Sequence, residues 1–413
     1  MNEMNAGIKL LDGVKIVAFT QMLLGPAGVQ YLADLGADVI KIEPLGKGAM
    51  ERGWAGGETY LNGESAFFLL ANRNLRSLSV NLKSPEGKKL VDDLIAQADV
   101  VVENFRPGVL DRLGFGWEEL SARHPALIYA SASGYGRQGP YTHLPGQDLL
   151  LQAMSGLAAN TGLAGHLPTP AGAPVVDQHA GTLLALGMLA ALFARERTGV
   201  GQRVDVTMLE AALDLQQESL VYFLNGGKVS RPLSPIASAF HEAPYGIYQT
   251  ADGHVAISLR PVALISAALG NPEGLKELLD PKLAYERRSD IHDAIAPQLR
   301  EMSTDAVVEL LRQHDVWCAR VNDFDDLVAD PVFNHLNPVV DIDHPVAGKV
   351  KLFPHPIHYS SGDFQVRSVP PGVGQDTEDI LRELGYSSER IDRLFADGVV
   401  GAASRKGAPN VAV

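Results

Sequence analysis

Cysteine is nearly absent from this 413-residue chain, which contains only Cys318. A single cysteine excludes an internal disulfide framework and any cysteine-based zinc site formed within one chain. The sequence also lacks the motifs H-E-x-x-H, G-x-x-x-x-G-K-[ST] and G-x-S-x-G. These absences argue against a zinc protease, a P-loop nucleotide-binding protein and an α/β-hydrolase. We therefore expect no metal site, and a reducing compartment such as the cytoplasm.

Positive charge is also scarce, because 35 Lys and Arg residues face 49 Asp and Glu residues, for a net charge of −14. This balance argues against a nucleic-acid or anionic-membrane surface. The longest apolar run, 183–193, is too short to span a bilayer and predicts a buried helix. The first 13 residues show neither the basic start nor the apolar run of a secretory signal. An anionic ligand would need a local cluster of arginines, lysines or helix N-termini.

What is present is the composition of a globular protein, with 46% hydrophobic and 20% charged residues. The length predicts two or three domains. In the first third of the chain, strand-like runs alternate with helical segments. The runs are 14–19, 37–42, 77–82, 99–103 and 127–131, and the helical segments are 28–35, 85–97 and a helix starting within 107–113. This alternation predicts an α/β fold whose parallel sheet is covered by helices on both faces.

The remainder of the chain has a different pattern. We expect 146–223 to be mainly helical and a Pro-, Ser- and Gly-rich segment at about 225–245 to be a linker. A hairpin over 247–259, helices up to 325 and a final strand near 317–321 predict a smaller α+β domain. Prolines recurring from 331 to 371 predict an extended return segment, followed by two terminal helices over 377–384 and 388–395.

One glycine motif follows a predicted strand. Residues 134–139 match G-x-G-x-x-G, the phosphate-binding half of a dinucleotide fingerprint. Pro140 and the residues after it stand where the fingerprint requires a helix to begin. The motif therefore favours a turn that binds no nucleotide.

Two aspartates precede apolar helical segments. Asp177 lies immediately before the most apolar segment of the chain, and Asp148 lies before another. A carboxylate in this position can cap the helix N-terminus, where backbone donors would also hold it ionised. It can equally be a nucleophile toward an acyl group. The residues alone leave both roles open.

A third candidate segment, 104–108, follows the strand-like run that ends at Glu103. Loops after the carboxyl ends of parallel strands form the ligand crevice of such sheets. Asn104 offers an amide, Phe105 an aromatic face, and Arg112 a nearby positive charge. This combination suits an adenine nucleotide with phosphates. A turn that starts a helix and carries solvated arginines explains the same residues equally well.

The sequence resembles the class III CoA-transferases, a family that includes formyl-CoA transferase and carnitine CoA-transferase. Five segments carry the resemblance in the order in which the family has them: 32–43, 81–120, 131–141, 146–157 and 195–211. The resemblance extends from Leu11 to about Phe395. It implies an interlocked homodimer in which each subunit is a ring threaded by its partner. It also implies a Rossmann-like large domain built from both chain ends, 1–224 and 331–413, and a small α+β domain over 225–330.

The resemblance further implies an enzyme that uses acyl-CoA as a substrate and has no tightly bound cofactor. Asp177 corresponds to the family's nucleophile, which forms an anhydride and then an aspartyl-CoA thioester, and Asp148 to an acidic residue that orients it. Trp54 corresponds to a substrate-contacting tryptophan. The positions that contact CoA in the family correspond to Gln21, Met22, Leu23, Val80, Lys83, Asn104, Phe105, Arg112, Gln147 and Met208. Of these, Lys83 and Arg112 would bind the phosphates.

Departures from the family pattern bear on the substrate. Leu23 stands where the oxalate-using members have a substrate-contacting glutamine, and 227–270 contains no run of glycines like the one that covers their site. These departures argue against formate and oxalate. Our hypothesis is a longer acid, such as the dicarboxylates succinate, itaconate or mesaconate. The expected partners are thus acyl-CoA, small carboxylic acids and a second copy of the chain.

The alternative function is that of an α-methylacyl-CoA racemase, which has the same fold. Racemisation needs two bases, one on each face of the α-carbon. Asp177 matches one base, but Gln147 stands where the family has the histidine. Glutamine cannot accept the proton, so His143 or His179 would have to replace it.

Overall fold

The computed structural model describes residues 7–402, so the first six residues, which we examined for a secretory signal, lie outside it. The chain forms two compact units. Unit 1 combines the residues up to 151 with 174–212 and the residues from 338 onward, and unit 2 combines 152–173 with 213–337. Our expected small domain covered 225–330 only. Unit 2 thus includes residues on both sides of that range, 213–224 and 331–337, together with the separate segment 152–173.

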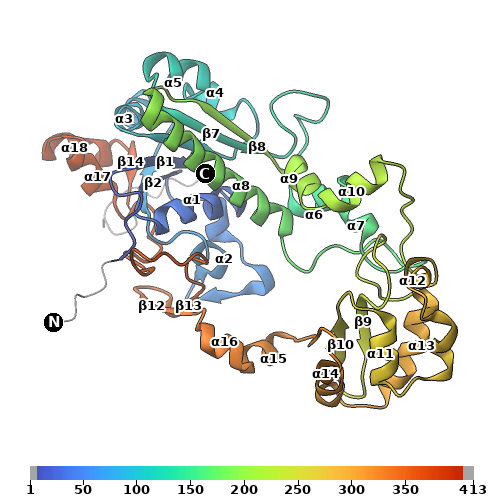
Figure 1. Cartoon of the computed structure of the whole chain (residues 1–413). Helices are drawn as coiled ribbons and strands as arrows, with labels where there is room; N and C mark the ends of the chain where they lie inside the picture. Colours follow the sequence, from blue (N-terminus) through green and yellow to red (C-terminus); the bar gives the residue numbers. More distant parts are fainter. Residues whose placement is uncertain (1–6, 403–413) are drawn as a thin grey trace. The chain divides into compact units, whose positions relative to one another are not determined.

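A seven-stranded sheet organises unit 1 (Figure 1). Its order is β14-β5-β2-β1-β6-β7-β8. Adjacent strands are parallel except for β14, which runs antiparallel to β5. The strands are β1 (Lys15–Phe19), β2 (Asp38–Glu43), β5 (Arg76–Val80), β6 (Val100–Glu103), β7 (Ile128–Ser133), β8 (Arg203–Thr207) and β14 (Val400–Gly401). The predicted α/β class with a parallel sheet is confirmed.

Helices cover both faces of this sheet, as predicted. Val100 and Val102 of β6 face one core, and Val101 between them faces the other, as the two-residue period of a strand requires. The first core contains α1 (Leu24–Asp34), α8 (Val175–Thr198) and α9 (Met208–Asp214). The second contains α3 (Pro85–Ile95), α4 (Val109–Leu113), α5 (Trp117–Arg123), α17 (Thr377–Glu383) and α18 (Ser388–Ala396).

The prediction that 146–223 is mainly helical is confirmed, although the strand β8 inside this range was missed. β8 is an edge strand whose side chains are half-buried or exposed, and its sequence RVDVT alternates charged and apolar residues. It therefore lacks the continuous apolar run of buried strands such as β1 and β6. The helices of the range are α6 (Asp148–Met154), α7 (Leu157–Asn160), α8, α9 and α10 (Gln217–Leu224).

The apolar run 183–193 lies within the 24-residue helix α8. By length and composition, α8 is the one helix of the described residues that could cross a membrane. Its residues Ala180, Leu184, Met188 and Ala191 are buried in the core of unit 1. A buried helix was predicted, although the helix is twice as long as the apolar run.

A close crossing of α1 and α8 sets the position of their first turns. A Cβ atom on Gly28 would lie 2.8 Å from the carbonyl oxygen of Gly181, and one on Gly181 would lie 2.9 Å from that of Leu24. The two glycines thus permit a backbone approach that no side chain would allow. α1 follows β1 directly and α8 leads into the parallel strand β8, so both helices begin at the carboxyl edge of the sheet.

Small elements complete unit 1. They are the 3₁₀ helices η1 (Met50–Gly53) and η2 (Gly56–Glu58), α2 (Ala66–Leu69) and two hairpins, β3 (Tyr60–Leu61) with β4 (Glu64–Ser65) and β12 (Val340–His344) with β13 (Gly348–Leu352). The β12–β13 hairpin packs on Phe68 and Leu69. The expected extended return after residue 330 is therefore wrong in part, because this segment contains a helix and a hairpin.

Unit 2 contains the predicted hairpin. β9 (Gly246–Gln249), β10 (His254–Ile257) and β11 (Cys318–Arg320) form an antiparallel sheet. Tyr248, Val255 and Ile291 are fully buried between this sheet and its helices. The helices of unit 2 that follow α10 are α11 (Val262–Ala268), η3 (Glu273–Leu278), α12 (Leu283–Glu286), α13 (Arg288–Arg300), α14 (Thr304–Gln313), α15 (Phe324–Ala329) and α16 (Pro331–Leu336).

Candidate active site

The neighbouring strands β1 and β6 form the switch point of the sheet, where the chain turns toward opposite faces. Ligand crevices of parallel sheets open at such a point. Asn104 follows β6 and Gln21 follows β1, and the two are joined by a pair of hydrogen bonds. Asn104 Oδ1 accepts from the Gln21 amide at 2.8 Å, and Asn104 Nδ2 donates to the Gln21 carbonyl at 2.9 Å. Two residues that the resemblance assigns to CoA therefore touch each other.

The loop between β1 and α1 is also held from its other side. The amide of Met22 donates to Glu51 Oε2 at 3.0 Å, and Lys41 Nζ donates to the carbonyl of Thr20 at 3.0 Å. Lys41 and Glu51 form a buried ion pair with each other. Sequence reasoning missed both residues, although Glu51 stands three positions before the predicted Trp54.

Glu103, the last residue of β6, shapes the turn that carries Phe105. Its Oε2 accepts from the Phe105 amide at 2.9 Å, and Ser131 Oγ donates a short hydrogen bond to its Oε1. Burial raises the pKa of Glu103 to about 7, although these two hydrogen bonds oppose the change. Sequence reasoning treated Glu103 only as the end of a strand. The sequence signal that could have identified Glu103 is a carboxylate directly after three consecutive valines in a predicted strand.

At the start of α8, Asp148 provides the cap that we considered for Asp177. α8 begins at Val175, and its preceding residue Pro174 provides no side-chain cap. Asp148 Oδ1 accepts from the amide of Val176 at 2.8 Å and from that of Asp177 at 3.1 Å. Asp177 is thus the third residue of the helix and not its cap. The capping role is wrong for Asp177, and the nucleophile role stays a prediction.

The carboxyl group of Asp177 is half-buried and stands beside a like charge. Burial and then the negative charge of Asp148 raise its pKa to about 7. The expectation that backbone donors hold Asp177 ionised is therefore wrong, since those donors bind Asp148. A carboxylate that loses solvation in this way is a stronger nucleophile when it ionises.

The other predicted residues lie at the same edge of the sheet as the Asn104–Gln21 and Asp148–Asp177 pairs. Val80 ends β5 and is buried, while Lys83 is exposed in the turn before α3. Gln147 is exposed beside Asp148, and Met208 is buried at the start of α9. Leu23 is buried before α1.

Arg112 and Trp54 are both exposed. Arg112 lies on α4, and a Cβ on Gly108 would approach its guanidinium to 3.1 Å, so the side chain folds back over the turn after β6. Trp54 follows η1 and packs edge-on against Phe67, with ring centroids 4.5 Å apart. Within residues 7–402, no hydrogen bond or ion pair joins the side chain of Lys83, Arg112 or Trp54 to another predicted site residue.

The glycine motif at 134–139 forms a loop without a helix, as predicted. A Cβ on Gly134 would lie 2.7 Å from the Cα of Gly146, so the two loop backbones touch. Gly134 therefore serves a close backbone contact beside Gln147, and no nucleotide is needed to explain it.

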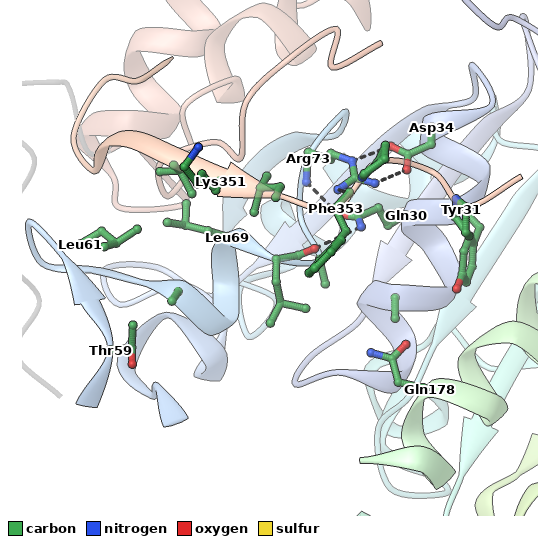
Figure 2. Close-up of a pocket in the computed structure, with 18 of the residues that line it drawn as sticks. Gln30, Tyr31, Asp34, Thr59, Leu61, Leu69, Arg73, Gln178, Lys351 and Phe353 are labelled. Carbon is green, nitrogen blue, oxygen red and sulfur yellow. Dashed lines mark hydrogen bonds and ion pairs between the residues drawn. The ribbon is translucent and has the colours of Figure 1, made fainter. Parts of the chain in front are cut away.

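A cavity of about 760 Å³ lies elsewhere in unit 1, between α1 and β13 (Figure 2). Gln178 lies at one end of it and Leu61 at the other, and the ion pair of Arg73 with Asp34 is in its wall. None of the predicted site residues lines this cavity, although Gln178 is the neighbour of Asp177. Among the described residues, no cluster of histidine, cysteine or carboxylate side chains is arranged to hold a metal ion.

Comparison with known proteins identifies the family of the chain. Residues 11–377 match the model of CoA-transferase family III. The chain is 33% identical to succinyl-CoA–D-citramalate CoA-transferase of Chloroflexus aurantiacus, covering 94% of this chain and 98% of the relative. It is 31% identical to succinyl-CoA:glutarate CoA-transferase of Mus musculus, covering 95% and 91%. A CAIB/BAIF family protein from Brucella suis has a similar structure, with a TM-score of 0.78, 30% identity and coverage of 92% and 100%. The chain belongs to CoA-transferase family III.

Proposed function

We propose that this protein transfers coenzyme A from an acyl-CoA donor to a carboxylic acid, with Asp177 as the covalent carrier. The observation that carries the proposal is the state of Asp177 at the start of α8. Asp148 takes the backbone donors of this turn, so Asp177 keeps a poorly solvated carboxyl group whose pKa is raised to about 7. Such a group can both attack an acyl carbon and leave it again.

In the first half of the reaction, an Asp177 oxygen attacks the thioester carbonyl of the donor. The C–S bond breaks, and CoA leaves as the thiolate while an aspartyl–acyl anhydride forms. The thiolate then attacks the aspartyl carbonyl, and the donor acid leaves as its carboxylate. Asp177 now carries CoA as a thioester, and no net proton has been gained or lost.

The second half repeats these steps with the acceptor. Its carboxylate attacks the aspartyl thioester, the thiolate leaves, and a new anhydride forms. Attack of the thiolate on the acceptor's acyl carbon gives the new acyl-CoA and returns Asp177 as a carboxylate. Division into these steps replaces one difficult exchange between two acids by a series of easier displacements.

The surrounding residues bind the CoA portion in this proposal. Asn104 and Gln21, joined by two hydrogen bonds, present the loops after β6 and β1 to the nucleotide. Phe105 supplies an aromatic face, and the exposed cations Lys83 and Arg112 supply charge for the phosphates. These cations supply the local positive charge that a chain of net charge −14 needs to bind an anion.

We also propose the family's assembly for this chain. The strand order β5-β2-β1-β6-β7-β8 supports the Rossmann-like description of the large domain. A homodimer is supported by apolar side chains that stay exposed in a single chain, including Phe223 on α10 and Phe324 on α15. The large domain would then correspond to unit 1, which is built from both ends of the chain, and the small domain to unit 2. The lone cysteine supports a cytoplasmic location.

For the substrates, we propose succinyl-CoA as donor and a dicarboxylate as acceptor. Two relatives are named as succinyl-CoA-dependent transferases, one acting on D-citramalate and one on glutarate. In this chain the buried Leu23 follows Met22 in the loop where oxalate-using members have a glutamine. An apolar side chain at this place suits a longer carbon chain between the carboxyl groups better than it suits oxalate.

The test is intact-protein mass spectrometry after mixing with succinyl-CoA. We expect a CoA-sized adduct that peptide mapping places on Asp177 and that one acid from a dicarboxylate panel discharges. Asp177→Asn should form none while still binding CoA. Absence of any adduct, together with deuterium exchange at the α-carbon of a branched acyl-CoA, would replace the transferase by the racemase.

A further inference from the structure

The ion pair between Lys41 and Glu51 is the most deeply buried ion pair near the candidate site. Lys41 Nζ lies 2.7 Å from Glu51 Oε1, and neither side chain is exposed to solvent. Burial of two charges costs several kcal/mol per ion, to an order of magnitude, and is repaid only where the remaining polar atoms are also bound. Here the remaining atoms bind a single loop, Thr20–Leu23, which joins β1 to α1.

This loop has an unfavourable backbone conformation. Met22 has φ of +59°, in the left-handed region that residues other than glycine, asparagine and aspartate seldom adopt. Glu51 Oε2 accepts the amide of Met22 at 3.0 Å, and Lys41 Nζ donates to the carbonyl of Thr20 at 3.0 Å. The ion pair thus binds the peptide groups on both sides of Gln21. Asn104 binds Gln21 itself through its amide and carbonyl.

A second ion pair holds Glu51 in place. Glu43, two residues after Lys41 on β2, binds Arg52, the neighbour of Glu51 on η1, through two hydrogen bonds of 2.7 Å. Residues two apart on a strand face the same side, so Lys41 and Glu43 of β2 both point toward η1. There the cation pairs with Glu51 and the anion with Arg52. A shift of η1 by one residue would oppose like charges. The alternation therefore specifies where Glu51 stands beside the loop.

We propose that the Lys41–Glu51 ion pair is a positioning device for substrate binding. It holds Met22 in the left-handed conformation and so presents Gln21 and Met22, the two half-buried residues of the loop, to the CoA thioester. Lys41 and Glu51 touch no substrate in this proposal, since both are fully buried. The inference rests on the proposed function for its link to CoA, and on the loop geometry alone for the rest.

Two double variants separate the hydrogen bond from the charges. Lys41→Met with Glu51→Leu removes both charges and leaves the Met22 amide without its acceptor. Lys41→Met with Glu51→Gln removes the same charges but keeps a side-chain oxygen for that amide. Replacement of a whole buried ion pair by apolar residues is often tolerated by the fold, whereas loss of one partner is not. The two variants therefore differ chiefly in the contact under test.

A third variant controls for the loss of any buried ion pair. Arg73 and Asp34 form a bidentate pair at the far end of α1, also almost fully buried (Figure 2). Arg73→Met with Asp34→Leu should lower the melting temperature without changing the loop after β1. All variants are compared with the unaltered protein in solution.

Amide hydrogen exchange of a peptide containing Met22 measures the loop without reference to catalysis. We expect the Met22 amide of the Lys41→Met/Glu51→Leu variant to exchange at least about tenfold faster than that of the unaltered protein. A tenfold increase corresponds to the loss of one hydrogen bond of about 1.4 kcal/mol. The Glu51→Gln variant and the Arg73 control should keep most of the protection. Equal protection in all four proteins would overturn the positioning role, whatever the protein catalyses.

Binding of CoA, measured by calorimetry, then tests the link to the substrate. We expect the Kd for CoA to rise about tenfold in the Lys41→Met/Glu51→Leu variant and to stay within about threefold in the Glu51→Gln variant. Faster exchange with unchanged CoA affinity would show that the loop does not serve CoA binding. If the unaltered protein binds no CoA at all, the proposed function fails, and the exchange result still decides the positioning role.

Discussion

Asp148, the first residue of α6, accepts a hydrogen bond from the backbone amide of Asp177, so two carboxylates lie at the first turn of α8. The amides of Val176 and Asp177 stabilise the charge of Asp148, and that charge in turn disfavours ionisation of the Asp177 side chain. The same arrangement therefore binds the carboxylate of Asp148 and disfavours a charge on Asp177. Asp177 changes its charge near neutral pH, because its pKa is raised to about 7.

The first prediction concerns the pH at which Asp177 becomes reactive. Formation of the succinyl-CoA adduct should rise with pH around a midpoint near 7, because only the carboxylate attacks and the pKa of Asp177 is about 7. Asp148→Asn should move this midpoint to lower pH. The asparagine oxygen can still accept from both amides, but the like charge is gone. Quenched-flow mass spectrometry from pH 5 to 9 measures the midpoint.

Glu118→Gln on the exposed first turn of α5 is the matched control, since it removes a carboxylate far along the chain from α8. It should leave the midpoint where it is. A midpoint that stays put or rises in Asp148→Asn would mean that Asp148 does not control the ionisation of Asp177.

The second prediction concerns stability. The pKa of Asp177 is raised from 3.8 to about 7, so between these values the folded protein binds more protons than the unfolded chain. Its contribution therefore favours folding below about pH 4 and is lost as the pH rises to 7. Asp177→Asn should raise the melting temperature above that of the unaltered protein at pH 8, with a difference that shrinks toward pH 4. Calorimetric scans at both pH values provide the measurement, and a difference that grows toward low pH contradicts the raised pKa.

Several parts of the fold and site were predictable because their signals are local. The strands β1, β2, β6 and β7 appear as short, largely apolar runs, and β5 as an alternation of serine with apolar residues. Asn104 could be placed at the sheet edge because it follows β6. β8 has no such run, because at the edge of the sheet only part of each side chain is buried. Its pairing with β7 depends on residues about 70 positions earlier, which no local pattern contains.

The partners of the site residues were not predictable for the same reason. Asp148 caps a helix that begins 27 residues later, and Glu51 binds the amide of Met22 across 29 residues. In the sequence, Lys41 looks like an ordinary charged residue alternating with isoleucines in a strand. The tertiary structure buries it completely. A buried lysine without a partner would strongly destabilise the fold, so Lys41 requires an anion beside it. No local sequence pattern around Lys41 identifies Glu51 as that anion.

The third prediction tests Arg112. Arg112→Ala should raise the KM for the acyl-CoA donor about tenfold, as expected for loss of a charged hydrogen bond to phosphate, and should lower kcat much less. Arg123→Ala provides the control, because Arg123 lies on the following helix and pairs with Asp92 on the surface. Steady-state kinetics with succinyl-CoA separate the two constants. A fall in kcat at unchanged KM would remove Arg112 from the binding site.

The fourth prediction concerns the crossing of α1 and α8, on which the position of Asp177 depends. A methyl group on Gly28 would lie 2.8 Å from the Gly181 carbonyl oxygen, so Gly28→Ala must push the helices apart. We expect a loss of about 1–3 kcal/mol in the free energy of unfolding, measured by urea denaturation. Gly172→Ala is the control, because a Cβ there meets no atom within 4 Å.

If the helices separate at Gly28, the first turn of α8 shifts relative to Asp148 as well. The adduct on Asp177 should then form more slowly even in the fraction that stays folded, and an unchanged adduct rate would mean that the crossing stabilises the sheet without positioning the nucleophile.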